Sequence, residues 1–166
     1  MHSDLERVLI IGNSGSGKSW LARQLAEKIA LPVTDLDNLN WEPGGYVKAR
    51  AKEAVLKAAL TIASEAHWIM EGVYGWIADS VATYATHIIW LTPAPAECVE
   101  NIKARGVRNN GSAADFAALL EWAAMYETRA GSSSYQGHLA VFAKASTAQQ
   151  IRLSSRDEMN QFLSLY

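Results

Sequence analysis

The sequence predicts a single α/β domain over residues 1–166, in which helices cover both faces of a parallel β-sheet. Short apolar runs typical of buried strands alternate along the chain with amphipathic helical segments, and such alternation requires right-handed crossovers between parallel strands. The 166 residues include 49% hydrophobic and 19% charged residues, so the chain can bury one core of ordinary size. No internal repeat or low-complexity segment indicates a second domain.

The first half of the chain contains three strand-like runs, each followed by a helical segment. Arg7–Ile11 is a continuous apolar run before a glycine, which is typical of a central strand buried on both faces. Leu21, Leu25 and Ile29 recur every four residues and predict an amphipathic helix from Lys18 that ends before Leu31-Pro32. The other elements expected here are a strand at Val33–Leu36, a polar loop at Asp37–Tyr46, a helix at about Lys48–Glu65, a strand at His67–Glu71 and a helix at about Trp76–Tyr84.

The second half continues the alternation with two more strands. His87–Leu91 is rich in β-branched residues and is bounded by Thr92-Pro93, so it is the clearest later strand. Ser112 and Asp115 form a capping-box start for a long helix that reaches about Arg129. The other elements expected are a helix at Pro95–Arg105, a flexible segment at Gly106–Gly111, a loop at Gly131–Ser134, a strand at Gln149–Leu153 and, after a capping box at Ser155–Glu158, a helix to Leu165.

Charge and cysteine content exclude several function classes. The 15 Lys and Arg residues against 17 Asp and Glu residues give a net charge of -2, so no overall field attracts nucleic acid or an anionic membrane. Cys98 is the single cysteine and cannot form an internal disulfide, and the histidines lack metal-ligand spacing. The first residues lack the basic-then-apolar pattern of a secretory signal. We therefore expect a cytoplasmic monomer or weak homodimer with no membrane span, and the charge balance disfavours a nucleic-acid partner.

An eight-residue glycine-rich motif lies between the first strand and the first helix. Its pattern, Gly-x-x-x-x-Gly-Lys-Ser, is the full phosphate-binding (Walker A) pattern. The glycines let successive amide N–H groups point inward, the helix N-terminus adds positive potential, and the lysine reaches the outer phosphates. An ordinary helix-capping turn is the alternative, but the register of strand, motif and helix favours nucleotide binding. The expected contacts to ATP are Gly12, Asn13, Ser14, Gly15, Ser16, Gly17, Lys18, Ser19 and Trp20, with Ser19 also coordinating Mg²⁺.

Three acidic residues lie where strands end beside this motif. Asp35 and Asp37 flank Leu36 at the end of the second strand, and strand alternation would point both carboxylates into one crevice. One can hold a magnesium-bound water while the other accepts a proton from an attacking hydroxyl; alternatively, both are solvated turn residues. Glu71 ends the third strand, the usual place for an acid on the magnesium side. The candidate metal residues are therefore Ser19, Asp35 and Glu71.

Arginines around a flexible segment are candidates for stabilising the transferred group. Phosphoryl transfer requires positive charge over that group, typically from a mobile lid. Arg105 and Arg108 frame the polar segment at Gly106–Gly111, and a closing hinge would bring Arg129 back over the phosphates. The alternative for each is a solvated charge at a helix end. We expect a short lid at about residues 105–131, with catalytic residues Lys18, Asp37, Arg105, Arg108 and Arg129.

The segments after the second and third strands are rich in aromatic and amide side chains. Rings stack on flat molecules while polar edges fix orientation, so this composition suits a sugar, a nucleoside or another flat neutral acceptor. Core packing is the competing explanation for tryptophans, and Trp68 and Trp90 are expected in the core because they lie in predicted strands. The candidate substrate contacts are Asp37, Asn40, Trp41, Arg50, Tyr74 and Trp76.

Together these motifs resemble the adenylate-kinase-like P-loop kinases, a group that includes shikimate kinase and gluconate kinase. The chain looks closest to bacterial P-loop proteins labelled DNA topology modulation protein or AAA-family ATPase. The resemblance covers nearly the whole chain and depends on Gly12–Ser19, Asp35–Trp41, Trp68–Tyr74 and Ile151–Arg156. It implies a three-layer P-loop NTPase fold with sheet order 2-3-1-4-5, and ATP on the glycine-rich loop with Arg156 near the adenine. It also implies that Asp35 is the magnesium-side acid and Asp37 the acceptor-side acid.

The sequence departs from this family at two points. Trp20 replaces a small hydroxyl residue that would contact the inner phosphate, and Arg50 is the one arginine between Arg23 and Arg105. Adenylate kinases proper grip an acceptor phosphate with arginines, so a nucleoside-monophosphate acceptor is disfavoured. The expected function is an ATP- and Mg²⁺-dependent small-molecule kinase of unknown acceptor. Two alternatives stay open: a non-catalytic or slowly hydrolysing ATP-dependent regulatory protein, and a nucleotide or polynucleotide 5'-hydroxyl kinase.

Overall fold

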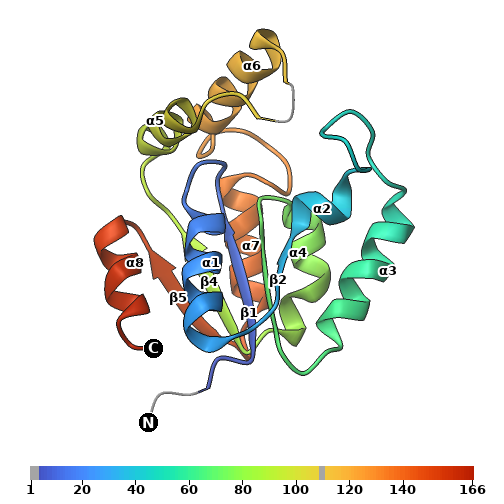
Figure 1. The fold of residues 1–166 in the computed structure, drawn as a ribbon, viewed down its shortest axis with the longest axis vertical. Helices are drawn as coiled ribbons and strands as arrows, with labels where there is room; N and C mark the ends of the chain where they lie inside the picture. Colours follow the sequence, from blue (N-terminus) through green and yellow to red (C-terminus); the bar gives the residue numbers. More distant parts are fainter. Residues whose placement is uncertain (1–3, 109–110) are drawn as a thin grey trace.

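A five-stranded parallel sheet forms the centre of the computed structural model, which describes residues 4–108 and 111–166 (Figure 1). In spatial order the strands are β2 (Val33–Asp35), β3 (Trp68–Gly72), β1 (Arg7–Gly12), β4 (His87–Leu91) and β5 (Gln149–Leu153). Every neighbouring pair is parallel, as helical crossovers between consecutive strands require. The predicted fold class and the strand order 2-3-1-4-5 are therefore confirmed.

Two hydrophobic cores enclose the sheet because its central strands are apolar at almost every position. In β1, Leu9 and Ile11 face one core, whereas Val8 and Ile10 face the other. The first core is covered by α3 (Lys52–Ala63), α4 (Gly75–Val81) and α7 (Tyr135–Lys144), and the second by α1 (Lys18–Ile29) and α8 (Arg156–Leu163) (Figure 1). As expected, Trp68 and Trp90 are core residues, 1% and 0% exposed.

Local sequence signals account for several helix ends. α5 (Pro95–Arg105) begins with a proline in its first turn and ends at Gly106, whose φ of +73° is in the left-handed region. α6 (Ala113–Ala124) and α8 are both capped as predicted, because Ser112 accepts the N–H of Asp115 and Ser155 accepts the N–H of Glu158. Figure 1 shows α5 and α6 above the ends of the strands, apart from the helices that cover the sheet.

The segment after β2 differs from the sequence-based expectation. The strand ends at Asp35 rather than Leu36, and the predicted loop begins with a short helix, α2 (Leu36–Asn40). The cause is local, since the Asp35 carboxylate accepts the N–H of Asp37 at 2.8 Å and so caps that helix. The next helix, α3, begins at Lys52 rather than Lys48 because the chain first forms a β-bridge between Trp41 and Ala49.

Three other elements also differ. The helix after β3 spans α4, Gly75–Val81, and continues as a 3-10 turn to Tyr84. α6 ends at Ala124 rather than Arg129 because Tyr126 turns inward, where its hydroxyl accepts a hydrogen bond from Trp90. α7 was not expected, although Ser134 caps it by accepting the N–H of Gly137. Within the described residues no helix is both long and apolar enough to cross a bilayer.

Candidate functional site

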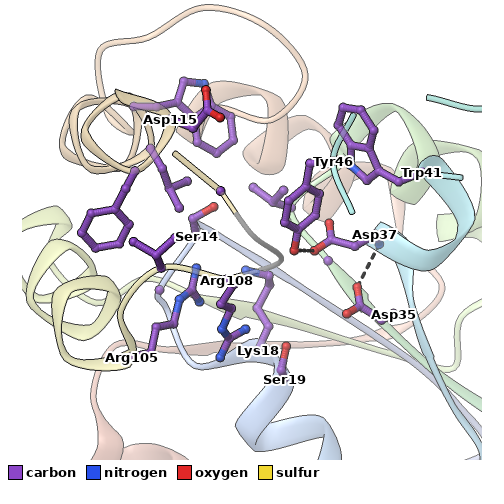
Figure 2. Close-up of a pocket in the computed structure, with 18 of the residues that line it drawn as sticks. Ser14, Lys18, Ser19, Asp35, Asp37, Trp41, Tyr46, Arg105, Arg108 and Asp115 are labelled. Carbon is purple, nitrogen blue, oxygen red and sulfur yellow. Dashed lines mark hydrogen bonds between the residues drawn. The ribbon is translucent and has the colours of Figure 1, made fainter. Parts of the chain in front are cut away.

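The glycine-rich loop and the three acids meet at one edge of the sheet. The strand register pairs Asp35 with Glu71 and Ile11 with Gly72, so these strands end at the same level beside the loop. A cavity of about 580 Å³ lies above this edge (Figure 2). Its described walls come from the glycine-rich loop, the ends of β2 and β3, the segment between α2 and α3, and the segment from Arg105 through α6. Open α/β sheets bind ligands at this kind of edge.

The backbone of the glycine-rich loop is shaped to hold an anion. Gly15 and Gly17 have φ values of +76° and +99°, and a Cβ added to Gly15 would lie 2.4 Å from the carbonyl oxygen of Cys98. The buried Ser16 Oγ has no hydrogen-bond partner within the described part of the chain. The buried Lys18 Nζ donates to the carbonyl oxygen of Asn13 at 2.7 Å. A curled loop with an available hydroxyl and a buried ammonium group fits the phosphates of a nucleotide.

Burial controls the protonation of the charged groups at the base of the cavity. It lowers the pKa of Lys18, although Glu71 and Asp37 favour the charged amine. Burial also raises the pKa of Glu71 to about 7, although Lys18 favours the carboxylate. In both groups, loss of water outweighs the attraction between opposite charges. Electrostatic contacts at this depth are therefore stronger than at the protein surface.

Three oxygen-bearing side chains can help to hold a magnesium ion. Ser19 Oγ donates to Glu71 Oε1 at 2.9 Å, and Asp35 lies beside Glu71 on the neighbouring strand. The pKa of Asp35 is raised by burial and by the charge of Asp37. In the described residues no cluster of three or more His, Cys, Asp or Glu side chains would bind a metal unaided. Magnesium here would therefore also need phosphate oxygens and water, its usual partners in nucleotide sites.

Asp37 lies in the first turn of α2 and faces the same cavity as Asp35 (Figure 2). The expectation that strand alternation orients both carboxylates is wrong, because β2 ends at Asp35 and Asp37 belongs to a helix. Tyr46 Oη donates to Asp37 Oδ2 at 3.3 Å and anchors the carboxylate from one side. Burial and the negative charge of Asp37 raise the pKa of Tyr46, so this hydroxyl remains a donor at neutral pH.

Arg105 and Arg108 both line the cavity and extend toward Lys18 from the side opposite Asp35 and Asp37 (Figure 2). Burial and the adjacent charge of Arg108 lower the pKa of Arg105. The arrangement places positive charge from the predicted lid on one side of the cavity and two acids on the other.

Arg129 does not line the cavity, yet it contacts the glycine-rich loop. Its Nη1 donates to Asn13 Oδ1 at 3.3 Å, and its guanidinium lies 3.4 Å from the centre of the Trp122 ring. It also donates to the carbonyl oxygens of Trp122 and Ser133. Burial lowers its pKa to about 10, which leaves it charged at neutral pH. Arg129 therefore joins the end of the lid to the loop in this structure, without the hinge closure that we had expected.

The predicted substrate residues divide into two groups. Trp41 and Tyr74 line the cavity, and Trp41 Nε1 donates to Tyr74 Oη at 2.6 Å. Arg50 instead lines an adjoining depression, where its Nε donates to the carbonyl oxygen of Trp41 at 3.1 Å. Neither Asn40 nor Trp76 is among the described cavity residues. Asn40 is buried, and Trp76 packs on the first core, with Lys52 Nζ 5.6 Å from the centre of its ring.

Trp20 and Arg156, both predicted near the nucleotide, contact each other. The Arg156 guanidinium lies 3.7 Å from the centre of the Trp20 ring, and Trp20 packs on the second core. Neither side chain is among the described residues that line the cavity. The stack joins the first turn of α1, directly after the glycine-rich loop, to the first turn of α8.

Sequence reasoning missed the contribution of α6 to the cavity. Phe116, Leu119 and Trp122 all line it, whereas the helix was expected only as part of a lid. Their three-residue spacing places them on one helix face, and this spacing was the available signal.

His138 was also missed, because the sequence treats it as an isolated histidine. It is fully buried in α7, where Nδ1 lies 2.6 Å from Tyr126 Oη and Nε2 lies 2.8 Å from the carbonyl oxygen of Val73. Only Nε2–H can donate to that carbonyl, so Nδ1 accepts from Tyr126, whose oxygen in turn accepts from Trp90 Nε1. Burial lowers the pKa of His138 to about 4. The network fixes the segment after α6 against β4 and against the residue that follows β3.

Comparison with known proteins identifies the fold. No protein-family model and no curated protein matches the chain. Among solved structures, shikimate kinase from Acinetobacter baumannii in complex with shikimate superposes with a TM-score of 0.61 at 12% identity, covering 97% of this chain and 92% of that one. The chain has a P-loop kinase fold.

Two further structures agree with this assignment. A gluconokinase from Sinorhizobium meliloti 1021 has a TM-score of 0.58 at 15% identity, covering 96% of this chain and 92% of its own. The YorR protein of Bacillus subtilis in complex with phosphorylated GDP has a TM-score of 0.52 at 15% identity, covering 95% and 94%. At these identities the likeness concerns the P-loop kinase fold itself, and the resemblance to proteins labelled DNA topology modulation protein stays a prediction.

Proposed function

We propose that this protein is an ATP- and Mg²⁺-dependent kinase that phosphorylates a hydroxyl group of a small molecule. The observation that carries the proposal is the position of Asp37, whose carboxylate lines the same cavity as Lys18 and Ser19. A nucleotide switch has no need of a carboxylate on the acceptor side, whereas a kinase uses one as a base. The named acceptors of the similar solved structures, shikimate and gluconate, support a small-molecule substrate.

Seven of the cavity residues have distinct roles in the proposed transfer. Lys18 and the amide N–H groups of the loop bind the phosphates, and Ser19, Asp35 and Glu71 hold the metal through direct or water-mediated contacts. Bound magnesium supplies positive charge at the phosphate oxygens.

Asp37 accepts the proton of the acceptor hydroxyl as that oxygen forms a bond to the outer phosphorus. The bond from this phosphorus to the bridging oxygen breaks at the same stage, so the products are the phosphorylated acceptor and ADP. Arg105 and Arg108, on the opposite side of the cavity, stabilise the charge on the transferred group. This division of roles separates the binding of ATP, through Lys18, from the activation of the acceptor, through Asp37.

A transfer assay with an acceptor panel tests the proposal. Purified protein is incubated with γ-labelled ATP, Mg²⁺ and nucleosides, nucleoside monophosphates, sugars, hydroxy acids and DNA ends, and the labelled products are separated. We expect label on one acceptor class, with turnover reduced about 100-fold or more in Asp37→Asn. Asp79→Asn is the matched control, because Asp79 is an exposed acid paired with Lys144 at 3.0 Å. Label that appears only in free phosphate would instead favour a slowly hydrolysing regulatory protein.

A further inference from the structure

α6 is unusually apolar for a helix that covers no core. Of its twelve residues, Asp115 and Glu121 are the charged ones, yet Ala123 is the one that is fully buried. Phe116, Leu119 and Trp122 lie on one face and line the cavity. Side chains of this kind on a solvated helix lower solubility without adding stability, unless they contact a ligand. The apolar face of α6 therefore serves as one wall of the binding site.

The opposite wall is aromatic, and the polar groups of its rings already have hydrogen-bond partners within the protein. Trp41 and Tyr46 pack edge to face with ring centres 5.8 Å apart. The Trp41 N–H donates to the hydroxyl of Tyr74, and the Tyr46 hydroxyl donates to Asp37. Val47, on the same segment, also lines the cavity and is 93% exposed. The surfaces that remain for a ligand are ring faces and aliphatic groups, which favour a flat apolar body.

The charges that line the cavity disfavour an anionic acceptor. Its described cations are Lys18, Arg105 and Arg108, and the phosphates of ATP would use all three. In the proposed mechanism Asp37 lies at the acceptor hydroxyl, so a carboxylate on the acceptor would add a second negative charge beside it.

The two nearby arginines do not change this charge balance within the cavity. Arg129 is held by Asn13 and by the Trp122 ring, and it does not line the cavity. Arg50 faces the adjoining depression and bonds to the carbonyl oxygen of Trp41. No cation of the described cavity wall is therefore left over for a negatively charged acceptor.

We infer that the acceptor is an uncharged alcohol built on an aromatic or similarly flat apolar ring, held between α6 and the Trp41–Tyr46 wall with its hydroxyl at Asp37. This inference rests on the proposed kinase function and narrows its substrate class. It also separates this protein from a kinase for a sugar acid, whose carboxylate requires a dedicated cation.

A matched pair of probes tests the inference by binding alone. Para-hydroxymethyl benzyl alcohol and para-hydroxymethyl benzoate share one ring and one hydroxymethyl group and differ in charge. Affinity is measured by saturation-transfer NMR titration with Mg²⁺ and a non-hydrolysable ATP analogue bound to the full chain. We expect the neutral probe to bind about tenfold or more tightly than the anionic one, because like charges at the acceptor position cost this much.

Variants of α6 test whether the affinity for the neutral probe depends on the apolar face of this helix. Phe116→Ala and Leu119→Ala should each weaken the neutral probe about fivefold or more, since each removes apolar contact area. Met125→Ala is the control, because Met125 is an exposed apolar residue at the end of α6 that does not line the cavity. Unchanged affinity for the ATP analogue shows that each variant is folded.

Each outcome decides the inference. Tighter binding of the benzoate overturns it, and so does binding of neither probe by protein that binds the ATP analogue. Neutral-probe affinity that is equal in Phe116→Ala, Leu119→Ala and wild type also overturns it. Selective neutral binding that is lost in the α6 variants supports it. If such binding occurs and no phosphoryl transfer to any alcohol follows, the proposed kinase function fails while the ligand class stands.

Discussion

The pH dependence of stability should reveal two buried groups that act in opposite directions. His138 has its pKa lowered from 6.5 to about 4, so the unfolded chain binds a proton that the folded chain excludes. As the pH falls from 6.5 toward 4, this group therefore lowers the free energy of unfolding, by about 1.4 kcal/mol per pH unit and about 3 kcal/mol in all.

Glu71 has the opposite effect. Its pKa is raised from 4.5 to about 7, so the folded chain binds the proton more tightly than the unfolded chain does. As the pH falls from 7 toward 4.5, this group raises the free energy of unfolding by a similar amount, about 3 kcal/mol. Asp35, whose pKa is also raised by burial, acts in the same direction. In the ligand-free protein the contributions of Glu71 and His138 nearly cancel.

Urea unfolding of the wild type, Glu71→Gln and His138→Gln at about pH 7 and about pH 4.5 separates the two groups. The protein is kept free of nucleotide and, with EDTA, of metal. Relative to wild type, acidification should destabilise Glu71→Gln by about 3 kcal/mol and stabilise His138→Gln by about as much. Groups that titrate in all three proteins cancel from this comparison. Identical pH slopes in the three proteins would refute the assigned burial effects.

Three further predictions follow from single contacts. Lys18→Ala should weaken ATP binding about 100-fold or more by calorimetry, because Lys18 contacts the phosphates. The free energy of unfolding should not fall, because the substitution removes a buried ammonium group. Unchanged ATP affinity would contradict a phosphate contact by this residue. Asn13→Ala should cost about 2 kcal/mol in urea unfolding, because Asn13 donates to Ala123 O at 2.9 Å and accepts from Arg129; a cost near zero would argue against that link. Gly75→Ala should lower the melting temperature by about 10 °C or more, because the added Cβ would lie 1.7 Å from a carbonyl oxygen; a melting temperature equal to wild type would contradict this packing.

Much of the fold could be predicted from local sequence signals. The continuous apolar run at Arg7–Ile11 and the β-branched run at His87–Leu91 are central strands because each can be buried on both faces. The serine caps at Ser112 and Ser155 form as expected, since each bonds to an N–H only three positions further along the chain. The glycine-rich loop is also contiguous in sequence, so its position between β1 and α1 needed no tertiary information.

The parts that could not be predicted depend on contacts between distant residues or on competing local preferences. Asn13 and Ala123 are 110 residues apart, and no pattern in the sequence indicates that they share a hydrogen bond. α7 was hidden because Gly137 and His138 interrupt its apolar periodicity, although His138 is buried. The contribution of α6 to the cavity depends on the position of this helix relative to the sheet, which is set by tertiary contacts. Its residue spacing gives a helix face but does not say what that face contacts.

The most direct test of the proposed kinase chemistry is the ratio of labelled organic phosphate to ADP formed from γ-labelled ATP in the presence of a neutral aromatic alcohol. A kinase with Asp37 as its base should give a ratio near one in the wild type. Asp37→Asn should form neither product at an appreciable rate while still binding ATP. A ratio near zero, with ADP and free phosphate formed equally by the wild type and Asp37→Asn, would contradict the proposed phosphoryl transfer.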